Sequence, residues 1–140
     1  MVEERVQGPV GPELLDQLHA TLERLWLRAP HVRADDRDAF RLAVGEVVGN
    51  LLRHGSGAGA VHAEVRLSAD HRTLVAVCVD DGDPVELPTL PDDPLAALAA
   101  LPADATSGRG LALARTAAEV TVTRQAERTT WTVRRALRTA

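Results

Sequence analysis

The most constraining feature of the sequence is the stretch RLAVGEVVGNLLRHG at residues 41–55. Its apolar residues recur at helical spacing, which predicts a helix with one buried face. Glu46, Asn50 and His54 are four residues apart, so they form one polar row beside that face. Asparagine is a mediocre helix former, so Asn50 indicates either a solvent-exposed surface or a functional site. This stretch alone leaves both interpretations open. The positions predicted to be buried are Phe40, Ala43, Val44, Val47, Val48 and Leu51.

Two helices are predicted in the first part of the chain. GPELLDQLHATLERLWLRA carries leucines at helical spacing, with Pro12 suited to the first turn and Pro30 to the end of the helix. The second helix is predicted over residues 37–53, with Asp35 or Asp36 as its N-cap. The glycines of HGSGAGA end this helix, so the polar row ends beside a loop.

Four strands and one more helix are predicted after this loop. VHAEVRLS alternates like a half-buried strand, TLVAVCVD is more continuously apolar, and the short ADHR between them predicts a hairpin. A third helix is predicted within SGRGLALARTAAEV, followed by the strands EVTVTR and TTWTVRR, which QAE joins. Residues 83–107 hold several prolines and acids around one short helical candidate, PLAALAAL. Long connections of this kind are commonly lids.

Composition narrows the class of protein. A chain of 140 residues, 45% hydrophobic and 26% charged, suits a single globular domain over residues 1–140. The net charge of -4 and the scattered basic residues argue against direct nucleic-acid binding. No apolar run has the length of a membrane span and the first residues lack a signal-peptide layout, so a cytoplasmic protein is expected.

Two residue counts exclude particular chemistries. Cys78 is the only cysteine, which excludes an intramolecular disulfide and a cysteine-based zinc site and leaves packing as its expected role. All 16 basic residues are arginine. The absence of lysine excludes a Walker-A phosphate loop, a Schiff base and the strand lysine of common protein kinases.

Two further motifs lie where predicted elements meet loops. In VDDGDP, Asp80 ends a strand and would accept a hydrogen bond from a ligand amino group, while Gly82 would let a ligand approach the backbone. The alternative is an ordinary Asp-Gly turn. In GRGL, glycines open a helix whose first amides suit a phosphate, and Arg109 either binds that phosphate or is solvated. A plain glycine-rich helix start is the alternative.

In order and spacing, these motifs resemble the N, G1 and G2 boxes of the GHKL ATPase superfamily, which includes gyrase, histidine kinases and mismatch-repair ATPases. The combination is more specific than any of its parts. The short length, the HG after the N box and GRGL followed by LAR resemble the anti-sigma factor serine/threonine-protein kinases in particular. The resemblance spans roughly residues 10–135.

The resemblance implies an α+β Bergerat fold, a two-layer sandwich with a mixed, mostly antiparallel sheet, helices on one face and an ATP lid at about 83–107. It implies that Asn50 coordinates Mg2+ and that Glu46 activates the attacking hydroxyl. Asp80 would recognise the adenine amino group and Gly82 would admit the base. The residues that would wrap the phosphates are Gly108, Arg109, Gly110 and Leu111. His54 either contacts the ligand or interacts with carbonyls at the helix end.

The leading hypothesis is an ATP-dependent anti-sigma factor kinase that binds a sigma factor and phosphorylates an anti-anti-sigma protein of the STAS type. Family resemblance also implies a homodimer. The first alternative is a non-catalytic nucleotide-binding module that sequesters a partner, because Pro84 replaces the last glycine of the G1 box and no base precedes Gly108. A detached histidine-kinase ATPase domain ranks third, because no helical hairpin with a phosphoacceptor histidine is visible.

Overall fold

The computed structural model describes residues 1–54, 61–82, 93, 95–96, 99 and 109–138. Within this part, helices and strands follow one another along most of the chain. In chain order they are β1 (Val2–Pro9), α1 (Pro12–Arg28), α2 (Ala34–His54), β2 (His62–Ala69), β3 (Thr73–Asp80), α4 (Arg109–Ala117), β4 (Glu119–Gln125) and β5 (Arg128–Ala136).

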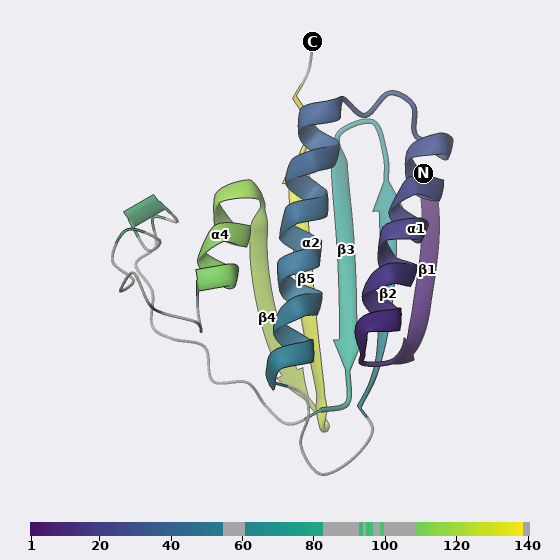
Figure 1. Cartoon of the computed structure of the whole chain (residues 1–140). Helices are drawn as coiled ribbons and strands as arrows, with labels where there is room; N and C mark the ends of the chain where they lie inside the picture. The colour runs from purple at the N-terminus through teal and green to yellow at the C-terminus, as the bar shows by residue number, and fades with distance from the viewer. Residues whose placement is uncertain (55–60, 83–92, 94, 97–98, 100–108, 139–140) are drawn as a thin grey trace.

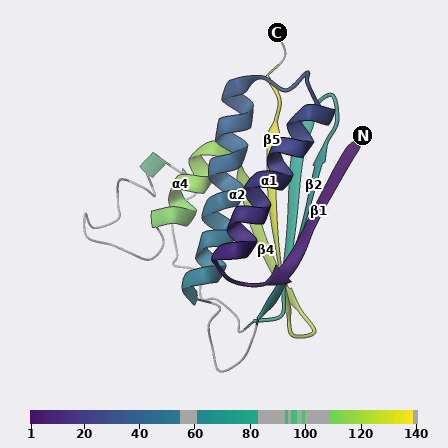
Figure 2. The same cartoon turned by 45° about the vertical axis from the view of Figure 1, so that its right-hand side comes forward.

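The strands form one five-stranded sheet in the order β1-β2-β3-β5-β4. Helices α1, α2 and α4 cover one face of this sheet, and no described helix covers the other, open face (Figures 1 and 2). This arrangement confirms the expected α+β two-layer sandwich with helices on one face. Every neighbouring pair of described strands is antiparallel, so the parallel pair that a mixed sheet would contain is not found in this part of the chain.

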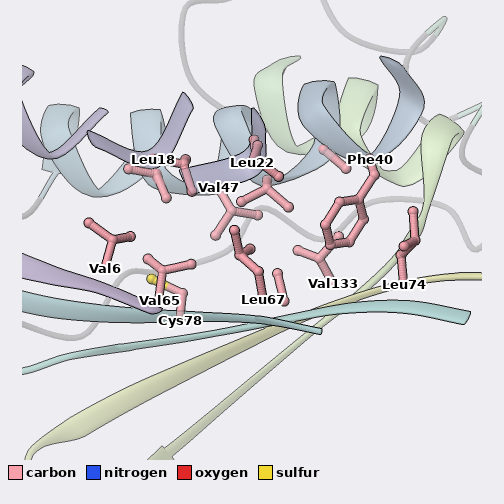
Figure 3. Packing of buried hydrophobic residues seen from close by; sticks show 14 of the residues in the cluster. Val6, Leu18, Leu22, Phe40, Val47, Val65, Leu67, Leu74, Cys78 and Val133 are labelled. Carbon is pink, nitrogen blue, oxygen red and sulfur yellow. The ribbon is translucent and has the colours of Figure 1, made fainter. Parts of the chain in front are cut away.

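The hydrophobic core lies between the sheet and the helices (Figure 3). Alternation explains which strand residues enter it, because in β3 every second side chain from Leu74 onwards is buried. The predicted buried face of α2 is confirmed: Phe40, Ala43, Val44, Val47, Val48 and Leu51 are at most 1% exposed. Cys78 packs in this core as predicted, and burial, together with the nearby Asp80 charge, raises the pKa of its thiol to about 12.

Two features of the fold differ from the sequence-based expectations. Strand β1 was not predicted, yet it pairs along its whole length with β2 at the edge of the sheet. Helix α2 begins at Ala34, before the predicted start at residue 37, so Asp35 and Asp36 both lie inside its first turn and neither is the N-cap. Among the described residues, no helix is long and apolar enough to cross a membrane.

Asp36 instead forms a buried ion pair that ties together three elements. Arg135 Nε, from β5, donates to Asp36 Oδ1 at 2.9 Å, and Arg135 Nη1 donates to the carbonyl of Ala117 at the end of α4 at 2.6 Å. The Asp36 side chain is 1% exposed and that of Arg135 is 16% exposed. The pair therefore fixes the start of α2 and the end of α4 to the sheet.

Candidate functional site

The chemistry-bearing residues gather at one end of the sandwich. Helix α2 and strands β3 and β4 end there and β5 begins there, at the lower end of Figure 1. Asn50 comes from α2, Asp80 and Gly82 from the end of β3, and Thr129 from the start of β5. Segments that are far apart in the sequence thus supply polar groups to one region.

Asp80 is a buried carboxylate with one oxygen in use. It is 3% exposed, and its Oδ1 accepts a hydrogen bond from the Gly82 backbone N–H at 3.0 Å. Among the described residues, its Oδ2 has no hydrogen-bond partner. Burial raises the pKa of Asp80, opposed by the Gly82 N–H and the Arg124 charge, while the Asp81 charge adds to the rise. Asp80 therefore presents an unused acceptor that a ligand N–H would satisfy.

Gly82 is needed here for space. A Cβ at this position would lie 3.2 Å from Asp80 Oδ1 and 3.2 Å from Val61 Cγ1, tighter than ordinary van der Waals contact. A side chain would therefore push against the carboxylate that the Gly82 N–H holds. The backbone at Gly82 has no positive φ, so close approach and not left-handed geometry explains the glycine.

Asn50 is the second buried polar residue with unmet hydrogen-bonding capacity. It is 3% exposed in α2, and its Nδ2 has no partner within the described part of the chain. An unpaired buried polar group costs about 1–3 kcal/mol, so two such groups at one end of the molecule indicate a ligand site. The other two buried unpartnered atoms in that part of the chain are the indole nitrogens of Trp26 and Trp131, both core residues.

Glu46 lies one helical turn before Asn50 and is half-buried. It borders an open depression along the outer side of α2, which Leu15 and His19 of α1 also line. The predicted polar row is therefore not uniform, because Asn50 turns into the protein while Glu46 stays accessible. Solvent exposure, one of the two interpretations of Asn50, is excluded.

The predicted phosphate-binding residues are described only in part. Helix α4 begins at Arg109, and Gly110 in its first turn is half-buried. The Leu111 side chain is 6% exposed and belongs to the hydrophobic core, so only its backbone could face a phosphate. Outside the described residues lie Gly108, Pro84, nearly all of the predicted lid at 83–107, and the side chains of Arg109 and His54.

Sequence reasoning missed two residues of this region, Thr129 and Arg124. The strand register places Asp80 opposite Thr129 and Thr129 opposite Arg124. Thr129 is 3% exposed, and one nitrogen of Arg124, Nη1, donates to Thr129 Oγ1 at 2.8 Å and to the Gly82 carbonyl at 2.7 Å. The alternation of TTWTVRR puts Thr129 on the same face as Trp131, and that pattern could have revealed it.

Comparison with known proteins agrees with this geometry. The family model described as histidine kinase-like ATPase domain matches residues 9–135, nearly the whole chain. The chain belongs to the histidine kinase-like ATPase family. Membership implies that this domain binds ATP. No curated protein matches the sequence at a significant level.

The residues of this histidine kinase-like ATPase fit the ligand that its family implies. Among the described residues, Asp80 Oδ2 has no partner and suits an amino group, and the lack of a Cβ at Gly82 leaves that carboxylate in place. The described residues contain no group of three or more His, Cys, Asp or Glu that could hold a metal ion. The Asn50 amide oxygen is the kind of hard oxygen ligand that Mg2+ accepts beside nucleotide phosphates.

Proposed function

We propose that this histidine kinase-like ATPase is an anti-sigma factor with ATP-dependent serine/threonine-protein kinase activity toward an anti-anti-sigma (STAS) protein. The observation that carries the proposal is the pair of buried polar atoms without a partner among the described residues, the Asn50 Nδ2 donor and the Asp80 Oδ2 acceptor, with the half-buried Glu46 one turn before Asn50. The resemblance of the HG and GRGL motifs to anti-sigma kinases supports the subclass.

Each residue has a distinct role in the proposed reaction. Asp80 Oδ2 accepts from the adenine amino group, and the Asn50 amide oxygen is the protein ligand for Mg2+. Glu46 precedes Asn50 by one turn, about 6 Å along the helix axis at 1.5 Å per residue. Its carboxylate takes the proton of the substrate hydroxyl while that oxygen bonds to the γ-phosphorus of ATP and ADP leaves.

The proposed product explains how the enzyme would switch partners. A phosphoserine or phosphothreonine carries about -2 charge near neutral pH. At a packed interface, this charge repels acidic neighbours and is costly to desolvate. Phosphorylation would therefore release the antagonist, leave the kinase free to hold a sigma factor, and so lower sigma-factor availability. Pairing of two copies as a homodimer is part of the same proposal.

Phosphotransfer by a variant at Glu46 tests this proposal. Glu46→Gln keeps the size of the side chain and removes the base, so it should bind ATP normally and lose about 10²–10⁴ in transfer rate. The assay incubates the purified protein with labelled ATP, Mg2+ and STAS antagonists, and a pull-down measures sigma-factor capture. The matched control is Glu13→Gln, in the first turn of α1. Full transfer by Glu46→Gln would remove Glu46 from the catalytic role.

A non-catalytic nucleotide-binding module that sequesters a regulatory partner is the second candidate. Pro84 in the G1 box and the absence of a base before Gly108 favour it, because the family resemblance leads one to expect a glycine and a lid cation there. ATP binding and sigma capture by the wild-type protein, without transfer to any antagonist, would select this module over the kinase.

A further inference from the structure

The inner face of the sheet ends in one polar row. Cross-strand register aligns Cys78 with Trp131 and Val122, all of which pack into or against the hydrophobic core. Two residues further along β3, the register aligns Asp80, Thr129 and Arg124, of which Asp80 and Thr129 are buried and Arg124, at the edge of the row, is exposed. The aligned side chains therefore change from apolar to polar between Cys78 and Asp80, at the candidate nucleotide site.

Arg124 organises this row through a single atom. Its Nη1 donates to Thr129 Oγ1 at 2.8 Å and to the Gly82 carbonyl at 2.7 Å, so the two hydrogens of that nitrogen serve two acceptors. The bond to the Gly82 carbonyl holds the turn whose N–H occupies Asp80 Oδ1. Among the described residues, Asp80 Oδ2 has no partner and remains available as an acceptor.

The hydrogen bond from Arg124 also determines whether the Thr129 hydroxyl donates or accepts toward a ligand. A threonine hydroxyl has one hydrogen to donate and can accept bonds through its oxygen. Because the oxygen already accepts from Arg124, the hydrogen of Thr129 points elsewhere and acts as a donor. The row thus places a hydroxyl donor on the strand next to a carboxylate acceptor, and both of these residues, Thr129 and Asp80, are only 3% exposed.

We propose that Arg124 is a positioning residue for base selection, which sets the Asp80 acceptor and the Thr129 donor so that the domain prefers adenine over guanine nucleotides. The edge of adenine offers an amino donor next to a ring-nitrogen acceptor, which complements this pair. Guanine offers a carbonyl next to a ring N–H, so acceptor would face acceptor and donor would face donor. A buried site built around hydrogen bonds rejects such a mismatch strongly.

The inference rests on the proposed ATP binding and is tested by nucleotide discrimination. Isothermal titration calorimetry with Mg2+·ATP and Mg2+·GTP compares the wild type with Arg124→Ala. Loss of Arg124 frees the Thr129 hydroxyl to rotate and releases the Gly82 carbonyl. The dissociation constant for ATP should therefore rise about 5–10-fold, and the preference for ATP over GTP should fall by at least about 5-fold. Arg124→Lys, which keeps the charge and several donors, should retain more of the preference than Arg124→Ala.

A double-mutant cycle separates positioning from a general structural effect. Thr129→Val removes the hydroxyl at almost constant shape, and the effects of Arg124→Ala and Thr129→Val on the preference should be non-additive. Arg128→Ala is the matched control, because this exposed arginine lies at the same end of the sheet and lines a hollow on the open face. It should leave the preference unchanged. If Arg124→Ala does not fold by circular dichroism, Arg124→Gln replaces it as the uncharged variant.

The outcomes distinguish this inference from the proposed function. A wild-type protein that binds no ATP overturns the nucleotide site and the inference with it. A wild type that prefers ATP, together with an unchanged preference in both Arg124→Ala and Arg124→Lys, overturns the inference alone. Additive effects of Arg124→Ala and Thr129→Val also overturn it, because Arg124 would then not act through Thr129.

Discussion

At the scale of single residues, Asp80 combines a requirement of binding with a cost to stability. Burial raises the pKa of Asp80, so the folded protein binds its proton more tightly than the unfolded chain does. The raised pKa therefore lowers the free energy of unfolding. This loss of stability is complete at pH values above the folded-state pKa, and it disappears as the pH falls to the unfolded-state pKa. A ligand that donates to Oδ2 compensates for the buried charge.

Asp80→Asn should therefore move affinity and stability in opposite directions. Without its carboxylate acceptor, the variant should bind ATP at least about tenfold more weakly in calorimetry. Without ATP, it should unfold at a higher temperature at neutral pH, and this gain should shrink as pH falls through the ordinary aspartate range. A gain of about 1 kcal/mol corresponds to an increase of about 2–4 °C in Tm for a domain near this size.

Asp81 provides the control for this substitution. It follows Asp80 directly, is exposed, and accepts a hydrogen bond from the His62 N–H at 2.8 Å. Asp81→Asn should change ATP affinity little. Equal ATP affinity in the Asp80→Asn variant and the wild type would end the assignment of Asp80 to the adenine amino group.

At the scale of elements, the Asp36–Arg135 pair is the main polar connection between α2, β5 and α4. Arg135→Met removes the arginine partner of the buried Asp36 carboxylate, which keeps the Arg138 N–H at 3.3 Å, and it removes the donor to the Ala117 carbonyl. Removing one member of a buried pair typically costs about 3–5 kcal/mol. We expect a decrease of this size in the free energy of unfolding measured with urea.

The neighbouring Arg134 is the matched control for Arg135. It is exposed on the other face of β5, so Arg134→Met should change stability by less than about 0.5 kcal/mol. Equal stability of the two variants would show that the buried pair contributes nothing net to the fold.

Local patterns predicted most elements because their signals lie within short windows of sequence. The buried face of α2 and the alternation of β2 and β3 follow directly from hydrophobic spacing. Strand β1 lacks that signal, because of its residues only Val6 is fully buried. Asp36 looked like an N-cap because its partner, Arg135, lies 99 residues away in the sequence.

Sequence motifs predicted only part of the candidate site. Asn50 and Asp80, which the motifs singled out, are both buried, each at 3% exposed. Thr129 and Arg124 belong to no motif. Their place beside Asp80 depends on the cross-strand register, which is set by the packing of the whole sheet and not by neighbours in the sequence.

At the scale of the whole molecule, bound nucleotide should stabilise the entire domain. A ligand that binds only the folded state adds about 2.7 kcal/mol at a free concentration of 100 times its dissociation constant. Mg2+·ATP should therefore raise the Tm of the wild type in a concentration-dependent way in differential scanning calorimetry. Gly82→Ala, whose Cβ would crowd Asp80 and Val61, should show a smaller shift at the same ATP concentration. An equal shift in both proteins would show that crowding at Gly82 does not disturb the Asp80 carboxylate that is proposed to bind the base.

The position of β5 has a consequence for how the chain reaches its native state. β5 is the last of the described strands in the sequence, yet it lies between β3 and β4 in the sheet. When the ribosome has released the chain only as far as β4, the strand that joins β4 to the rest of the sheet is therefore still missing. Until then, β3 has an open edge and the apolar side chains facing Trp131 lack their cover. Such a nascent chain is exposed to aggregation and to chaperones, so slower translation just before β5 should lower the soluble yield.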